Sequence, residues 1–302
     1  MGNIERYLRP EVIRTVARLD LKARFIVEGF FSGLHASPYH GFSTEFSEHR
    51  EYTFGDEPRL IDWKVFARTD KHYVKRFEAE TNLNCHMLLD VSESMAYGSG
   101  GGLSKLDYAI CMAAALGYML IHQQDNVGLV TFDEDVTNLV PARSRRSHLA
   151  ALLGVLAGAL RHRPSRLAHS LHRSAGMLSR RGLVIVLSDL IPSEHEEPDD
   201  VLDGLRHLRH RGHDVICFQL LDHAEVRFPF HGPVHFMDVE SLRTVRTDAD
   251  AVAAGYRREV EAFVRKCRDA CRHERIDFLQ VDTEDSFDRV LLAFLRARQS
   301  RF

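Results

Sequence analysis

The chain has 302 residues, of which 44% are hydrophobic and 27% are charged. These proportions are ordinary for a soluble globular protein, and the length suits one large domain with a smaller one beside it. The formal net charge of −3 gives no reason to expect nucleic-acid binding. The N-terminus has no apolar signal core, and the longest apolar stretch, 108–121, is too short to cross a bilayer. We therefore expect a cytoplasmic protein without a transmembrane segment.

The first 84 residues differ in composition from the rest, and we expect them to form a separate N-terminal part. Residues 10–28 have the apolar spacing of an amphipathic helix, and residues 46–81 interleave opposite charges with aromatic residues. Such a pattern is typical of a small β-rich subdomain held by cross-paired ions. A solvated hairpin surface is the alternative.

From residue 85 onward, apolar strand-like runs alternate with helical periods. The predicted strands are 85–90, 126–132, 136–140, 182–187, 213–221 and 277–281, with an extended excursion at 226–238. The predicted helices are 105–123, 147–160, 167–178, 198–211, 248–273 and 286–298. The short turn 133–135 predicts a hairpin, so the third strand should be an antiparallel edge.

This alternation predicts an α/β domain over residues 85–302, with a doubly wound, mostly parallel sheet covered by helices on both faces. In such sheets ligands bind outside the carboxyl ends of the strands, where the strand order reverses. Asp90 and Asp189 both fall at predicted strand ends.

The most informative motif follows the first of these strands and reads Asp90-x-Ser92-x-Ser94. One carboxylate and two hydroxyls at a strand end offer hard oxygen ligands, which Mg²⁺ prefers. The alternative is that Asp90 caps the next turn and the serines are ordinary loop residues.

A second carboxylate strengthens the metal interpretation. Asp189 ends the fourth strand, which a doubly wound order places beside the first, so two carboxylates and several hydroxyls should converge on one cleft. Ser165, between two predicted helices, is the candidate for a further hydroxyl ligand.

These residues resemble the metal-ion-dependent adhesion site of the von Willebrand factor A-like (VWA) fold. That family has Asp-x-Ser-x-Ser after its first strand, a threonine on a later loop and an aspartate after its fourth strand. Asp90, Ser92, Ser94 and Asp189 match this pattern. Ser165 departs from it, because the family usually has threonine there, often after glycine, whereas Pro164 precedes Ser165.

The segment 48–69, EHREYTFGDEPRLIDWKVFART, resembles the signature upstream of this motif in bacterial proteins of the DUF58 family, as does Ser32-Gly33-Leu34-His35. The likeness covers most of residues 33–135 and the order of elements beyond. Members of that family are commonly encoded beside MoxR-type AAA+ ATPases. The resemblance therefore implies a partner or adaptor of such an ATPase in the assembly or maturation of protein complexes.

The resemblance also implies roles for the five residues. Ser92 and Ser94 would bind Mg²⁺ or Mn²⁺ directly, Asp90 directly or through water, and Asp189 through water, with Ser165 as a further ligand. An Asp or Glu of a partner protein would fill the open coordination position. The expected protein is a metal-dependent binding module and not an enzyme.

Two other functions stay open. Asp90 at a strand end suits an aspartyl nucleophile of a Mg²⁺-dependent phosphohydrolase, although Ser92 stands where such enzymes carry a second aspartate. The second alternative function is a scaffold that binds no metal.

The glycine-rich loop 98–102 before Lys105 lacks the order of a phosphate-binding P-loop. The five cysteines show no disulfide or zinc spacing, and their odd count favours a reducing compartment.

Overall fold

The computed structural model describes residues 46–51, 63–69, 71, 73–77, 83–99, 102–159, 164–178, 180–238, 243–287 and 289–293. The predicted helix 10–28 and the Ser32–His35 motif lie outside the described residues. The chain divides into two compact units, Ala36–Leu83 and the remainder, Met1–His35 with Asn84–Phe302.

The smaller unit contains one antiparallel strand pair and a helix. Strand β1 (Phe46–Glu51) pairs with β2 (Tyr73–Phe77), and α2 (Trp63–Thr69) lies between them in the sequence. The register places Glu48 opposite Arg76. In α2, the rings of Trp63 and Phe66 meet edge to face at 6.0 Å. The predicted ion network stays a prediction, because most of its charged side chains lie outside those that the structure describes.

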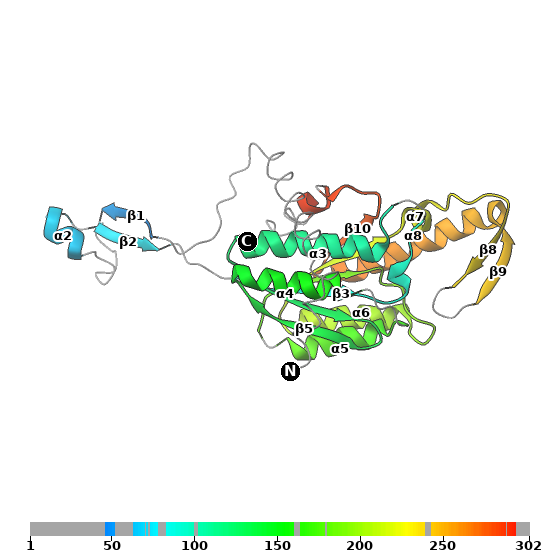
Figure 1. Ribbon diagram of the computed structural model, residues 1–302, viewed down its shortest axis with the longest axis horizontal. Coiled ribbons are helices and arrows are strands. Elements are labelled where there is room, and N and C mark those ends of the chain that lie inside the picture. The colour runs from blue at the N-terminus through cyan, green and yellow to red at the C-terminus, as the bar shows by residue number, and fades with distance from the viewer. Residues whose placement is uncertain are drawn as a thin grey trace. The chain divides into compact units, whose positions relative to one another are not determined.

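The larger unit is built on a six-stranded sheet in the order β10-β7-β6-β3-β4-β5 (Figure 1). Its strands are β3 (Asn84–Asp90), β4 (Asn126–Phe132), β5 (Val136–Arg143), β6 (Leu183–Ser188), β7 (Asp214–Leu221) and β10 (Asp277–Asp282). All neighbours run parallel except β4 and β5. The predicted mostly parallel, doubly wound sheet and its antiparallel third strand are confirmed.

The strands form where the sequence supplies uninterrupted branched apolar residues. Every residue of β6, Leu-Val-Ile-Val-Leu-Ser, is buried, whereas β5 has no buried residue. A strand buried on both faces needs no polar alternation, because helices cover both sides of a parallel sheet. The edge strand β5 is partly open to water, which fits its more polar sequence.

Helices cover both faces of the sheet (Figure 1). They are α3 (Lys105–His122), α4 (Arg146–Ala157), α5 (Leu167–Met177), α6 (Pro198–His210) and α8 (Ala249–His273), and residues 289–293 are also helical. Helices α3 and α4 pack together over β3, β4 and β5, while α5, α6 and α8 form a second packed group. The second group buries Leu171, Leu205 and Cys267 against Val184 and Val186 of β6.

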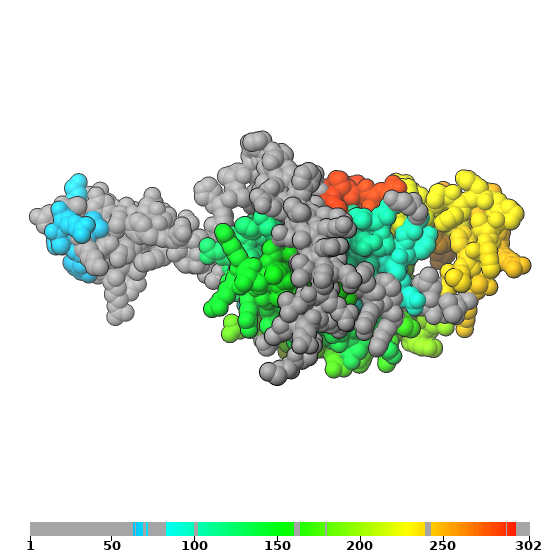
Figure 2. Space-filling view, viewed as in Figure 1, coloured from blue at the N-terminus to red at the C-terminus, as the bar shows by residue number. Residues whose placement is uncertain are grey.

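The predicted excursion at 226–238 is more structured than expected. It begins at the end of the short helix α7 (His223–Arg227) and continues into strand β8 (Pro233–Met237), which forms a hairpin with the later strand β9 (Thr244–Asp248). Aromatic residues join it to the start of α8, and the rings of Phe228 and Tyr256 lie 4.7 Å apart. The hairpin lies at one end of the larger unit (Figures 1 and 2).

The five cysteines are buried and not in disulfides, as the sequence predicts: Cys85, Cys111, Cys217, Cys267 and Cys271. Within the described residues, no helix combines the length and the apolar character needed to cross a membrane.

Candidate metal site

The candidate site lies where the strand order reverses, at the carboxyl ends of β3 and β6. Leu89 pairs with Leu187, so the next residues along each strand, Asp90 and Ser188, meet at this edge. The two crossovers leave toward opposite faces here, which is where doubly wound sheets place ligands.

Asp90 is almost fully buried, and both of its carboxylate oxygens accept hydrogen bonds. The Ser188 hydroxyl donates to Oδ2 at 2.6 Å, and the Ser92 backbone N–H donates to Oδ1 at 3.0 Å. The capping role that was the alternative interpretation is therefore realised, since Asp90 does close the following turn. It does not exclude metal binding, because a carboxylate has about four lone-pair positions.

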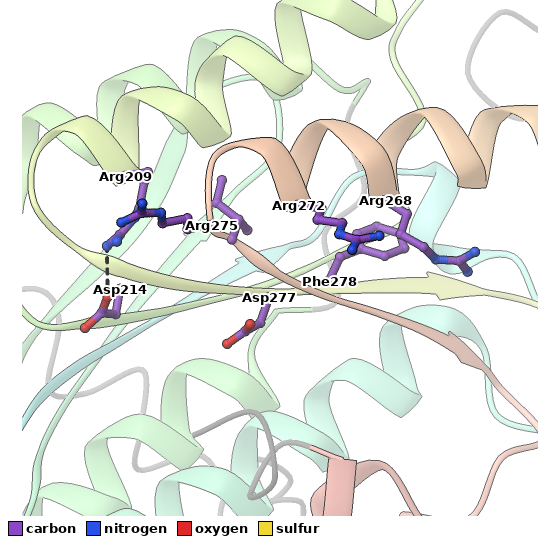
Figure 3. A pocket seen from close by; sticks show the side chains of 8 residues that line it. Arg209, Asp214, Arg268, Arg272, Arg275, Asp277 and Phe278 are labelled. Carbon is purple, nitrogen blue, oxygen red and sulfur yellow. Dashed lines mark hydrogen bonds and ion pairs between the residues drawn. The ribbon is translucent and has the colours of Figure 1, made fainter. Parts of the chain in front are cut away.

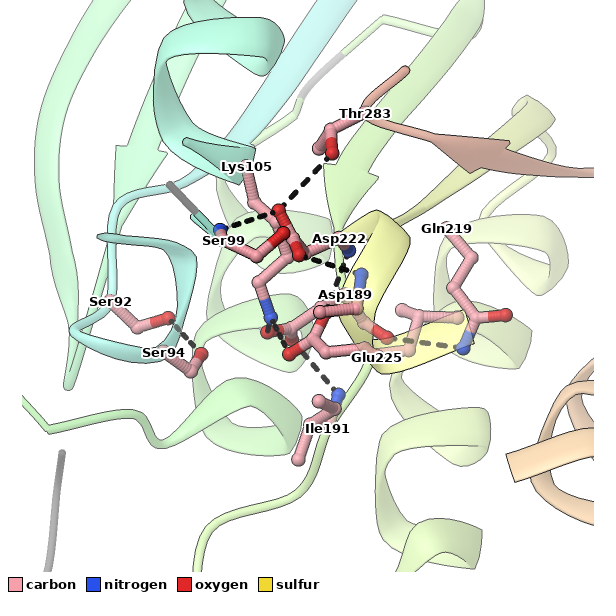
Figure 4. Close-up of polar contacts among 12 residues, drawn as sticks. Ser92, Ser94, Ser99, Lys105, Asp189, Ile191, Gln219, Asp222, Glu225 and Thr283 are labelled. Carbon is pink, nitrogen blue, oxygen red and sulfur yellow. Dashed lines mark hydrogen bonds and ion pairs between the residues drawn. The ribbon is translucent and has the colours of Figure 1, made fainter. Parts of the chain in front are cut away.

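Ser92 and Ser94 present their hydroxyls together on the loop after β3 (Figure 4). Their Oγ atoms lie 3.2 Å apart. Ser92 is buried and Ser94 half-buried. A short 3₁₀ turn, Ser94–Ala96, fixes this loop, and the buried side chain of Met95 holds it against the core. Two adjacent hydroxyl oxygens therefore lie beside a carboxylate, as the prediction of a metal half-site requires, while their role as ligands stays a prediction.

Asp189 faces a buried ammonium group that the sequence did not suggest. Its Oδ2 pairs with Lys105 Nζ at 2.9 Å, and the same Nζ pairs with Glu225 Oε1 at 2.8 Å (Figure 4). The Ile191 backbone N–H donates to Asp189 Oδ1 at 3.0 Å. Lys105 is thus the buried counter-ion of two carboxylates, and its side chain is not a phosphate ligand.

Burial in this cluster disfavours the ionised forms of the Asp90 and Glu225 carboxylates. Burial, with the charge of Asp189 as second cause, raises the pKa of Asp90 to about 7. Burial alone would lower the pKa of Lys105, but the Asp189 and Glu225 carboxylates outweigh it and raise that pKa above its ordinary value. Burial also raises the pKa of Glu225, although Lys105 opposes the shift. The cluster holds more buried negative charge than Lys105 balances.

The described donors fit a hard divalent cation. Asp90, Ser92 and Ser94 offer only oxygen atoms, which suits Mg²⁺ or Mn²⁺ and not a thiolate- or imidazole-seeking metal. Across the described part of the chain, no three or more His, Cys, Asp or Glu side chains gather as a metal-binding group. A cation here would therefore depend on hydroxyls and water as much as on carboxylates.

Ser165 reaches the same edge of the sheet but is not joined to the other four residues by any hydrogen bond within the described region. It is buried, and the next residue, Arg166, donates its backbone N–H to the Asp133 carbonyl at 3.4 Å. Asp133 directly follows Phe132, which pairs with Asp90. The loop carrying Ser165 is thus beside the site, while the coordination role of its hydroxyl stays a prediction.

Sequence reasoning missed Ser188, Lys105 and Glu225. Ser188 precedes Asp189 directly, and a hydroxyl there was the available signal. Glu225 completes a capping box with Asp222 on α7, a local pattern readable as Asp-x-x-Glu. Lys105 carried no local signal, because its partners lie 84 and 120 residues further along the chain.

An aromatic hollow of about 620 Å³ adjoins the site. Tyr97, on the loop after Ser94, lines it together with Glu225, and Phe228, Phe236 and Tyr256 form its apolar walls. Glu225 therefore touches both the hollow and, through Lys105, the candidate metal cluster. An apolar group bound in the hollow would lie next to the metal loop.

A family model described as a protein of unknown function, DUF58, matches residues 48–269. The chain belongs to the DUF58 family. Uncharacterised proteins of Mycobacterium tuberculosis and Mycobacterium bovis are each 27% identical to this DUF58 protein over 270 residues, which cover 85% of this chain and 83% of theirs. The resemblance noted in the segment 48–69 is thereby confirmed at the level of the family.

The fold of this DUF58 protein also occurs in a solved structure. An aerotolerance-related membrane protein from Bacteroides fragilis superposes with a TM-score of 0.50 at 15% identity, covering 72% of this chain and 99% of that chain. At that identity the likeness concerns the fold alone.

Proposed function

We propose that this DUF58 protein is a VWA-like binding module that holds Mg²⁺ or Mn²⁺ for a partner protein. Ser92 and Ser94 bind the cation directly, Asp90 directly or through water, and Asp189 through water, with Ser165 as a further ligand. A carboxylate of the partner fills the open position. The observation that carries the proposal is the meeting of Asp90, Asp189 and two hydroxyls at the switch point of the sheet.

Charge supports a cation at this position. Within the described part of the chain, no ammonium or guanidinium group pairs with Asp90, and burial with the Asp189 charge destabilises its ionised form. A divalent cation would offset both carboxylates and restore the ionised state of Asp90. Lys105 offsets one of the two negative charges of Asp189 and Glu225, and the remaining charge of the cluster is left for the metal.

The surroundings of Asp90 favour binding over catalysis. A nucleophilic carboxylate needs an accessible oxygen, whereas Asp90 is 1% exposed and both its oxygens accept hydrogen bonds. The aromatic hollow beside Tyr97 gives a partner's apolar side chain a place next to the metal-bound carboxylate. On the family resemblance, the partner is a MoxR-type AAA+ ATPase or a protein that it acts on.

The isosteric variant Asp90→Asn tests the metal site. Mg²⁺ should raise the thermal midpoint of the wild type and leave that of Asp90→Asn unchanged. In EDTA the variant should be the more stable of the two, because a buried like charge is gone. The matched control is Ser174→Ala, which changes a buried serine on α5 whose hydroxyl has no hydrogen-bond partner among the described residues. It should keep the wild-type Mg²⁺ response. Equal Mg²⁺ shifts in wild type and Asp90→Asn would refute the site.

Capture of the partner provides the second test. The wild type should retain the ATPase on a column in Mg²⁺, lose it in EDTA and regain it on adding Mg²⁺ back. Asp90→Ala should not retain it under any of these conditions. Capture that is indifferent to both EDTA and Asp90→Ala would exclude a metal-bridged contact.

A further inference from the structure

Helix α5 begins directly after the Ser165 loop, and its first turn is capped from another part of the chain. Its N-cap residue, Arg166, is among the described residues and forms no side-chain hydrogen bond to the helix. The first backbone N–H groups of an α-helix have no partner within the helix and need an acceptor from elsewhere. A group that supplies this acceptor also determines where the Ser165 loop lies.

Glu196 supplies the acceptor from the loop between β6 and α6. Its Oε2 accepts the Leu167 N–H at 2.9 Å, and its Oε1 accepts the Ala168 N–H at 3.0 Å. The His169 N–H is a third donor, to Oε1 at 3.4 Å. The helix dipole also favours a carboxylate at this end of α5. Both oxygens of Glu196 therefore hold the first turn of α5.

The loop between β6 and α6 holds Glu196 in this position. The Ser193 hydroxyl donates to Glu196 Oε2 at 3.1 Å, and the Glu196 N–H donates to the Ser193 carbonyl at 3.1 Å. The same loop begins with Asp189, directly after β6. The Glu196 carboxylate thus joins the loop of Asp189 to the loop of Ser165.

The Ser165 loop is also held from β4. The Asp133 carbonyl, directly after β4, accepts the Arg166 N–H at 3.4 Å and the Ser170 hydroxyl at 3.0 Å. In the sheet, β3 lies between β6 and β4. The Ser165 loop is therefore anchored on both sides of the strand that ends in Asp90.

We propose that Glu196 is a positioning residue of the candidate metal site and holds the Ser165 hydroxyl where it can reach the cation. The inference rests on the proposed metal-binding function. Glu196 acts through the Ser165 loop: without its carboxylate, the first turn of α5 loses its acceptor and Ser165 is no longer fixed beside Asp90. Contacts that orient a metal ligand typically contribute about 10–100-fold to metal affinity.

Calorimetry with MgCl₂ and the full chain tests the proposal. Glu196→Ala should raise the Mg²⁺ dissociation constant by about tenfold or more, as should Ser165→Ala. The double variant should bind no more weakly than Ser165→Ala alone, because one residue acts through the other. Glu196→Gln, which keeps one acceptor oxygen, should recover part of the affinity. A merely structural cap would lower the thermal midpoint and leave the dissociation constant unchanged.

Two control variants separate positioning from stability. Glu194→Ala, in the same loop, removes an exposed pair with Arg243 and should keep the wild-type dissociation constant. Arg209→Ala removes the pair with Asp214 at 2.8 Å, at the amino end of β7 (Figure 3). It should lower the thermal midpoint without changing Mg²⁺ binding.

Hydrogen exchange in EDTA tests the same contact without metal. The amides of Leu167 and Ala168 should exchange faster in Glu196→Ala than in the wild type, and equal exchange would overturn the proposal. Mg²⁺ binding that Glu196→Ala or Ser165→Ala leaves unchanged, or additive losses in the double variant, would overturn the positioning role alone. A wild type that binds no Mg²⁺ would refute the proposed function and the positioning role with it.

Discussion

Lys105 is the residue on which the charge balance of the candidate site depends. Its side chain is 1% exposed, and its ammonium is shared between Asp189 and Glu225. A buried carboxylate without a counter-ion is strongly disfavoured. The same lysine therefore stabilises the fold and leaves the Asp90 side of the cluster open to a metal.

Replacing Lys105 by methionine should destabilise the protein strongly. The change leaves two buried carboxylates without their cation, at a cost of about 3–5 kcal/mol in the free energy of unfolding. Urea unfolding measures this loss. The matched control is Lys266→Met, which removes an exposed pair with Asp199 and should cost less than about 1 kcal/mol. Similar losses in the two variants would show that Lys105 is not the counter-ion of the cluster.

At the scale of the elements, the site depends on how closely β3 and β6 approach. Gly182 directly precedes β6, and a Cβ placed on it would lie 2.0 Å from the Asn84 carbonyl oxygen at the start of β3. Only glycine allows these backbones to meet. Their contact at this end sets the register that brings Asp90 and Ser188 together at the other.

Gly182→Ala should therefore lower the free energy of unfolding by about 1–3 kcal/mol, because the clash is with backbone and cannot be relieved by a side chain. Gly176→Ala is the matched control. It lies in α5 with open space around the added methyl group and should gain up to about 1 kcal/mol from helix propensity. Chemical denaturation of the two variants measures both signs, and a neutral Gly182→Ala would contradict the close approach.

Strand β3 also carries a half-buried histidine, His86, whose protonation opposes folding. Burial, with the charge of His213 as second cause, lowers the pKa of His86 to about 4. The unfolded chain takes up this proton near pH 6.5 and the folded chain only near pH 4. Stability contributed by neutral His86 is therefore present above pH 6.5 and is lost as the pH falls toward 4.

Between pH 7 and pH 5 the wild type should lose about 2 kcal/mol of unfolding free energy through this group. Urea unfolding at both pH values measures the loss. His86→Gln, which cannot take up the proton, should show a smaller loss. Some dependence should remain, because burial also lowers the pKa of His213. An identical pH slope in both proteins would rule out His86 as its source.

At the scale of the whole molecule, the candidate metal site belongs to the larger unit. The proposed metal residues Asp90 and Asp189 lie at the carboxyl ends of β3 and β6. All six strands of the sheet and the core that joins them to α5, α6 and α8 fall between Asn84 and Asp282. Among the described residues, none of this sheet or core lies in the segment Ala36–Leu83, which is a separate unit.

A shortened chain in which a flexible glycine–serine linker replaces residues 36–83 should thus fold by itself and keep the full Mg²⁺ response. The reason is that it retains the sheet, the core and all five proposed metal residues. Circular dichroism and the Mg²⁺-dependent thermal midpoint, compared with the full chain, measure this. A shortened chain that folds but has lost the Mg²⁺ response would assign part of the metal site to residues 36–83.

The sequence by itself determined the order of the elements and the place of the motif. Both depend only on residues that are close together in the sequence. The apolar run Leu183–Leu187 specifies a strand buried on both faces, and Asp90-x-Ser92-x-Ser94 follows directly at the end of a strand. The extended interpretation of 226–238 was too simple, because the pairing of β8 with β9 and the packing on α8 are not local.

Only the tertiary structure decided which charges meet. Ser188 reaches Asp90 across 98 residues of sequence, and Lys105 reaches Glu225 across 120. A side chain's electrostatic role depends on its neighbours in space and on the water they exclude, and neither is encoded by spacing along the chain. The motif Asp90-x-Ser92-x-Ser94 indicated where the candidate site lies, and the fold brought Lys105 to it as the counter-ion of Asp189.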